Sequence, residues 1–371
     1  MIRIILLDLD GVLIQPGGYR AALRATVQHF IGPRLDIHDE MLVDLENRGI
    51  TSEWDMSPLI LAAYWEDILS RQPMPDLPPD VSAAADEINS RYTVEAPTRL
   101  EVSEIPLVAG QYPSESALRA GRFASIPDEL RKNLLTGTRD IHHSHTMQIF
   151  QQFALGSRTF TETYQLPAKV DTGSFLLTHD KSNIDDEVRS ALRQAGHCLA
   201  GFTSRPSAPP REIAGSSSGY APEAELALKL AGLTDIPLIA FGKLEYLARQ
   251  YNLDPATLVK PSPVHALAGI LAAWTGNEWP SLQAANHWRE TGSLNGTFRP
   301  LPKAFELIVL EDTMAGIRSV RSAGEVIRQS GFDVHFRPLG MTLMNTRKAS
   351  AFEQAGVPYH QDWKSLIKEL A

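Results

Sequence analysis

Residues 2–13 read Ile-Arg-Ile-Ile-Leu-Leu-Asp-Leu-Asp-Gly-Val-Leu, an apolar run that ends in two carboxylates and a glycine. The short run of branched apolar residues predicts a strand that is covered on both faces of a sheet. Side chains two residues apart on a strand point the same way, so we expect Asp8 and Asp10 to emerge together at its end. Such a pair attracts a divalent cation and can divide the roles of nucleophile and proton carrier. Taken alone, Asp-Gly is equally typical of a turn.

Three later apolar runs are also predicted to be strands, and polar residues follow each of them. In chain order these residues are Thr203 and Ser204, then Lys260, then Glu311 and Asp312. Helical patterns lie between the runs, and this alternation predicts parallel strands joined by right-handed helical crossovers. Ligands bind outside the carboxyl ends of such strands, so we expect all four landmarks to converge on one crevice. Acids, hydroxyls and a lysine form the set that phosphoryl transfer needs.

Together these segments resemble the four motifs of the haloacid dehalogenase-like (HAD) hydrolase superfamily, in the family's order. The matching stretches are Asp8–Leu13, Thr203–Pro206, Lys260–Pro263, and Glu311-Asp312 with the Gly316-Ile317 and Ala323-Gly324 that follow. The second motif alone is a weak signal, whereas the combination is specific.

The resemblance implies an α/β fold, with a doubly wound, Rossmann-like parallel sheet as the core and a large, mostly α-helical cap inserted after the first strand. We predict that residues 1–15 and 186–371 form the core and that residues 16–185 form the cap. A chain of 371 residues is long for a single hydrophobic core, which also favours two domains.

For function, the resemblance implies a phosphatase that hydrolyses a small phosphorylated metabolite. Asp8 would be the nucleophile that forms an aspartyl-phosphate, and Asp10 would carry the proton. Thr203 would bind a phosphoryl oxygen, with Ser204 in its place if the strand ends one residue later. Lys260 would pair with Asp8 and with the phosphoryl oxygens.

The resemblance also implies Mg²⁺ as the cofactor. The ligands would be the side chain of Asp8, the backbone carbonyl of Asp10 and the carboxylate of Asp312, with Glu311 as a supporting or water-mediated ligand. Dehalogenases lack the second aspartate, so Asp10 favours phosphate over halide chemistry. Arg139, in the predicted cap, is a candidate for substrate binding, although arginines are more often salt-bridged or solvated.

Two alternatives stay open, a phosphomutase that uses the same aspartyl-phosphate and a non-enzymatic scaffold that binds a ligand or partner through its enlarged cap. The net charge of −9 offers no attraction to nucleic acid, and no apolar run approaches membrane-spanning length. A signal peptide is not expected, since its removal would take away the proposed nucleophile. Cys198 is the only cysteine, so no internal disulfide is available and a cytoplasmic location is expected.

Overall fold

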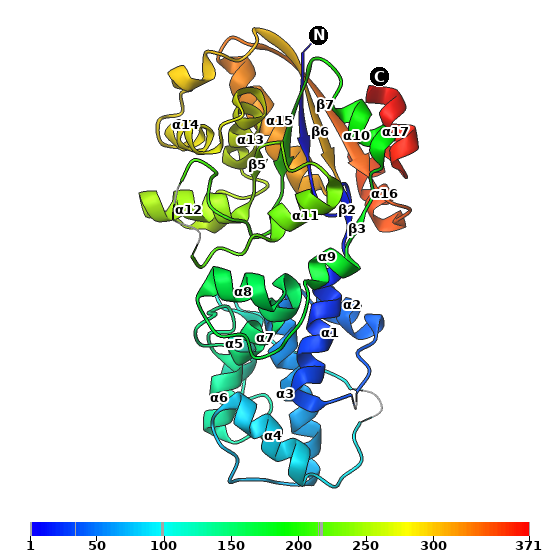
Figure 1. Ribbon diagram of the computed structural model, residues 1–371, viewed down its shortest axis with the longest axis vertical. Coiled ribbons are helices and arrows are strands. Elements are labelled where there is room, and N and C mark those ends of the chain that lie inside the picture. Colours follow the sequence, from blue (N-terminus) through cyan, green and yellow to red (C-terminus); the bar gives the residue numbers. More distant parts are fainter. Residues whose placement is uncertain (1, 34, 98–99, 214, 216–217, 371) are drawn as a thin grey trace. The chain divides into compact units, whose positions relative to one another are not determined.

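The computed structural model describes residues 2–33, 35–97, 100–213, 215 and 218–370. The chain divides into two compact units, which we call the core unit and the inserted unit. The segments near the two chain ends, blue and red in Figure 1, both belong to the core unit. The core unit is Met1–Pro16 with His179–Ala371, and the inserted unit is Gly17–Thr178.

A six-stranded parallel sheet in the order β5-β4-β1-β6-β7-β8 forms the centre of the core unit. The chain steps outward from β1 through β4 to β5, then crosses to β6 on the other side of β1 and continues to β7 and β8. This reversal next to β1 is the point at which doubly wound sheets bind ligands. The predicted fold class is therefore confirmed. The strands are β1 (Arg3–Leu7), β4 (His197–Phe202), β5 (Leu238–Ile239), β6 (Ala304–Glu311), β7 (Asp333–Met341) and β8 (Tyr359–His360).

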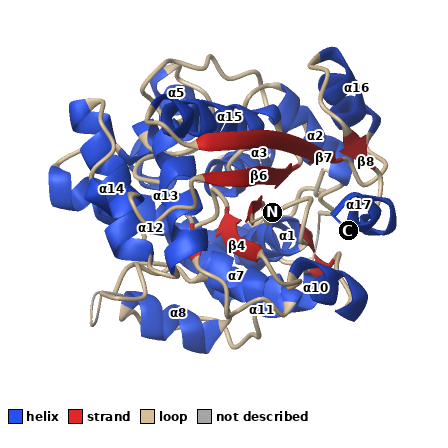
Figure 2. Cartoon of the chain, turned by 90° about the horizontal axis from the view of Figure 1, so that it is seen from above, coloured by secondary structure: helices blue, strands red, loops and turns tan. Residues whose placement is uncertain are grey.

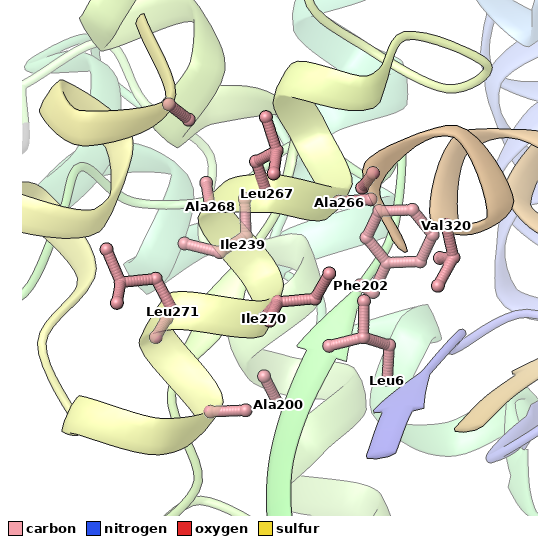
Figure 3. Close-up of a cluster of buried hydrophobic side chains, with 14 of the residues drawn as sticks. Leu6, Ala200, Phe202, Ile239, Ala266, Leu267, Ala268, Ile270, Leu271 and Val320 are labelled. Atoms are coloured by element: carbon pink, nitrogen blue, oxygen red, sulfur yellow. The ribbon is translucent and has the colours of Figure 1, made fainter. Parts of the chain in front are cut away.

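Helices cover both faces of this sheet, as Figure 2 shows from above. Alternation along β1 assigns the faces, because Ile4 and Leu6 belong to one buried cluster and Ile5 and Leu7 belong to the other. On the first face, Leu6 and Phe202 meet side chains of α13 and Val320 of α15 (Figure 3). Helices on this face are α12 (Phe241–Tyr251), α13 (Pro263–Thr275), α14 (Glu278–Thr291), α15 (Met314–Gln329) and α16 (Thr346–Gln354). Helices on the other face are α10 (Asp186–Leu192), α11 (Glu223–Ala231) and α17 (Trp363–Leu370).

The inserted unit is helical in its described residues, as predicted for the segment after the first strand. Its buried side chains recur at helical spacing, for example Ala22, Leu23, Val27 and Phe30 on the first helix. No helix in the described part of the whole chain is both long enough and apolar enough to cross a membrane. The helices are α1 (Gly18–Ile31), α2 (Asp39–Asn47), α3 (Glu53–Arg71), α4 (Val81–Arg91), α5 (Pro113–Arg119), α6 (Asp128–Leu135), α7 (His145–Leu155), α8 (Ser157–Tyr164) and α9 (Phe175–His179).

Two short antiparallel strands join the core unit to the insertion. The strand β2 (Ile14–Gln15) lies on the outgoing connection and β3 (Lys181–Ser182) lies on the returning one. Ile14 pairs with Ser182 and Gln15 pairs with Lys181. The chain therefore leaves and re-enters the core unit at adjacent points.

A buried lysine links the loop after β4 to the neighbouring helices through ion pairs and hydrogen bonds. Lys243 on α12 lies 3.1 Å from a carboxylate oxygen of Glu278 and 3.3 Å from one of Glu225, with 1% of its side chain exposed. Its ammonium also donates to the carbonyls of Ala208 and Pro209 in that loop. Burial raises the pKa of Glu225, and Lys243 opposes this rise. Because buried charges persist only when paired, this lysine holds the loop in one place.

Candidate active site

Three buried carboxylates meet at the carboxyl ends of β1 and β6. Asp8 follows β1, Glu311 ends β6, and the two strands are paired up to Leu7 and Leu310. One oxygen from each of Asp8, Glu311 and Asp312 lies within 4.8 Å of the others. This cluster, found in the described part of the chain, has the spacing to hold a metal ion. Its oxygen ligands suit a hard cation such as Mg²⁺.

Two glycines permit this close approach. Gly11 has a φ of +76°, and a Cβ atom there would overlap the carboxylate of Asp312. A Cβ atom on Gly316, in the first turn of α15, would overlap the carboxylate of Glu311. Both acids therefore lie directly against backbone, which fixes their positions.

Lys260 reaches this cluster, but the prediction that it follows a strand is wrong. It lies in a turn between a short 3₁₀ helix (η1, Pro255–Thr257) and α13. The apolar run before it consists of Leu258 and Val259, and only Leu258 is buried in the core. Such a run is too short to form a strand. Lys260 Nζ lies 2.8 Å from Asp8 Oδ1 and 2.5 Å from Glu311 Oε1. The turn thus places the ammonium of Lys260 against Asp8 and Glu311.

Burial and neighbouring charges shift the pKa values of this cluster. Burial, followed by repulsion from Glu311, raises the pKa of Asp8 well above its ordinary value. Burial also raises the pKa of Asp312, although Lys348 opposes the rise. Burial alone would lower the pKa of Lys260, but Asp8 and Glu311 outweigh it and raise that pKa. Among the described residues, three carboxylates contact two lysines, which leaves one negative charge unbalanced.

Glu311 and Asp312 differ in how their oxygens are used. Glu311 Oε2 accepts hydrogen bonds of 2.9 Å from the backbone N–H of Asp312 and from the N–H and hydroxyl of Thr313. The other oxygen of Glu311 accepts from Lys260. Asp312 Oδ2 instead pairs with the ammonium of Lys348 on α16. Lys348 carried no motif signal, since 36 residues separate it from Asp312.

Asp10 and Thr203 are both held by Arg205, which the sequence reasoning did not single out. Arg205 donates from Nε to Asp10 Oδ2 at 2.7 Å and from Nη2 to Asp10 Oδ1 at 2.5 Å. Nη2 also donates to Asp180 Oδ2 at 2.9 Å. The backbone N–H of Arg205 donates to Thr203 Oγ1, which leaves the hydroxyl hydrogen of Thr203 for a second partner. Ser204 is exposed beside them.

Arg139, the predicted substrate-binding residue of the insertion, is salt-bridged within the inserted unit. Its Nη2 lies 2.8 Å from Asp55 Oδ2, and the ring of Tyr112 lies 4.3 Å from its guanidinium carbon. Asp55 is fully buried and also accepts hydrogen bonds from Ser114 and Thr138. These contacts fix the arginine in place, and its role toward a substrate stays a prediction.

His265 holds the backbone of Lys260 through a hydrogen bond. It is fully buried on α13, where Nε2 lies 3.0 Å from the carbonyl of Ile239 and Nδ1 accepts from the backbone N–H of Lys260 at 3.3 Å. Burial and the nearby charge of Lys260 lower the pKa of His265 to about 3. A neutral imidazole with one donor and one acceptor nitrogen fits both partners.

This burial predicts a loss of stability in acid that depends on His265. The unfolded chain takes up a proton near pH 6.5 and the folded chain does not, so the free energy of unfolding falls as the pH drops below 6.5. The loss from this group is about 2 kcal/mol at pH 5 relative to pH 8. Urea unfolding of His265→Gln over this pH range is expected to show a shallower pH dependence. His287→Gln, at an exposed position, is the control, and an unchanged slope in His265→Gln would contradict the assignment.

Comparisons with known proteins show similarity of fold alone. No profile of a known protein family matches the chain, and no curated protein matches it. An X-ray structure of a Northeast Structural Genomics Consortium target is similar over 97% of this chain and 95% of its own, with a TM-score of 0.65 and 14% identity. CbbY from Rhodobacter sphaeroides, a mutant in complex with xylulose-(1,5)bisphosphate, aligns over 98% of this chain and 95% of its own, with a TM-score of 0.32 and 13% identity. The first of these supports the two-part α/β architecture described above.

Proposed function

We propose that this protein is a Mg²⁺-dependent phosphatase that hydrolyses a small phosphate monoester through an aspartyl-phosphate on Asp8. The observation that carries the proposal is the contact of Lys260 with both Asp8 and Glu311, at the switch point of a parallel sheet. A carboxylate attacks a phosphate ester only where positive charge offsets the charge of both groups. The motif order supports the same conclusion.

The donor set fits a divalent cation. Asp8 and Asp312 would be the direct side-chain ligands, because hydrogen bonds and Lys260 already engage both oxygens of Glu311. The excess negative charge of the cluster also favours a bound cation, because a substrate phosphate would add further negative charge to the site. When bound, Mg²⁺ would supply positive charge to the phosphoryl oxygens.

The side chains of the site divide the reaction into two steps. In the first step, a carboxylate oxygen of Asp8 bonds to phosphorus, the ester P–O bond breaks, and Asp10 gives its proton to the leaving oxygen. In the second step, Asp10 takes a proton from water, the water oxygen bonds to phosphorus, and the bond to Asp8 breaks. Thr203 and Lys260 would hold the phosphoryl oxygens during both steps.

A panel of phosphate monoesters tests this function. The purified protein is incubated with sugar, nucleotide and small organic acid phosphates, with Mg²⁺ or with EDTA, and released phosphate is measured. We expect release from at least one ester with Mg²⁺, loss of release in EDTA, and recovery when Mg²⁺ is added back.

Other outcomes of the panel would contradict the proposal. Release that EDTA leaves unchanged would exclude a metal-dependent site. Isomerised sugar phosphate without free phosphate would assign a phosphomutase. Binding of an ester without any turnover would favour the non-enzymatic scaffold.

A further inference from the structure

We propose that Arg205 is a positioning residue for Asp10, and that Asp180 holds Arg205 in place for this task. The inference rests on the proposed function, because it concerns the side chain that would move the proton there. It assigns roles to two buried charged residues, Arg205 and Asp180, to which the motif resemblance gave none.

Asp10 depends on another group for its orientation. It lies in the loop between β1 and β2, and 34% of its side chain is exposed. In the described part of the chain, the guanidinium of Arg205 is the side-chain donor that binds its carboxylate. Two parallel N–H···O bonds define both the position and the plane of a carboxylate, which a single contact does not.

Arg205 is itself immobilised. Only 2% of its side chain is exposed, and the buried carboxylate of Asp180 accepts from the same nitrogen that binds Asp10. Its backbone carbonyl accepts from the N–H of Phe241 at the start of α12, while its own N–H is bound to Thr203. A buried guanidinium requires such partners, because desolvation without them is costly.

The geometry matters because proton transfer is sensitive to distance. A proton carrier has to lie within hydrogen-bond reach of the leaving oxygen, and a displacement of about 1 Å can reduce the rate by about 100-fold. Without Arg205, Asp10 is free to rotate in its loop. Protonation of the leaving group would then slow, while attack by Asp8 would still occur.

A comparison of two esters separates positioning from structural support. Expulsion of 4-nitrophenolate needs little help from a proton, whereas expulsion of an alkoxide depends on one. For Arg205→Met we expect kcat/KM to fall by about 100-fold with an alkyl phosphate and by less than about 10-fold with 4-nitrophenyl phosphate. Arg205→Lys keeps the charge but lacks the planar fork, so we expect the same selective loss at a smaller size.

Three further comparisons complete the test. Asp180→Asn is expected to show the selective loss in weaker form, since an amide supports Arg205 less firmly. In an Asp10→Asn background, Arg205→Met should add no further selectivity, because the two residues act as one unit. Arg3→Met is the matched control, since Arg3 pairs with Glu306 on the neighbouring strand β6 and has no contact with Asp10. This control should affect both esters equally.

Each outcome bears on a different claim. If the wild type is active and Arg205→Met lowers both rates equally, the inference is overturned and the proposed phosphatase function stands. Arg205→Lys replaces Arg205→Met in this comparison if the latter does not fold. A wild type that hydrolyses neither these esters nor any member of the panel with Mg²⁺ would overturn the proposed function, and the inference with it.

Discussion

Asp8→Asn is expected to abolish phosphate release, with kcat lowered by about 10,000-fold or more. An amide cannot form the acyl phosphate on which both steps depend. The variant should nevertheless fold. Burial and Glu311 raise the pKa of Asp8, so ionisation of this group near neutral pH destabilises the folded state, and a neutral amide removes that penalty. In EDTA at pH 7 we therefore expect urea unfolding at the same or a higher concentration than for the wild type.

The matched control is Asp333→Asn, the same chemical change at an exposed position that begins β7. It should keep wild-type turnover and stability. Phosphate release and urea unfolding are measured on all three proteins. Asp8→Asn with more than about 1% of wild-type turnover would exclude Asp8 as the nucleophile.

Lys260→Met has the second largest expected effect, a loss of about 3 to 5 kcal/mol in the free energy of unfolding together with loss of turnover. Removal of this ammonium leaves Asp8 and Glu311 buried without their shared cation. Because the penalty comes from ionised carboxylates, stability should recover as the pH falls and these groups are protonated. Added Mg²⁺ should also restore part of it, since a bound cation replaces the missing charge.

Lys243→Met provides an unusually close control. Lys243 is also a buried lysine between two carboxylates, Glu225 and Glu278, but it lies on α12. We expect a comparable loss of stability in this variant and no recovery with Mg²⁺. The measurement is urea unfolding with Mg²⁺ or EDTA, and equal recovery of both variants would argue against a cation site beside Lys260.

The parts of the fold that local sequence specifies were predictable. The apolar run of β1 and its terminal acids, the alternation of strands with helices, and the helical insertion follow from periodicity and from residues close together in the chain. The approach of Lys260 to Asp8 followed from motif order, not from secondary structure, and the strand expected before that lysine is absent. A pair of apolar residues between prolines was too little evidence for a strand.

The supporting residues depend on packing between distant segments. Arg205 lies 195 residues from Asp10, and Lys348 reaches Asp312 from a helix beyond β7. His265 is one position in an apolar helix, and its ring acquires a role only through its contacts with the backbone N–H of Lys260 and the carbonyl of Ile239. Such contacts leave no periodicity or spacing in the chain, so single-sequence reasoning does not find them.

The pairing of Gln15 with Lys181 bears on how this architecture can be re-engineered. Neighbouring antiparallel strands can be closed by a reverse turn of only two residues, for which Asn-Gly is well suited. Replacement of the residues between these strands by such a turn would leave the six-stranded sheet of the core unit without its insertion, and a different module could be joined at the same place. The entropic cost of closing a loop rises only slowly with the length of the loop, so inserts of very different size are compatible with one unchanged sheet.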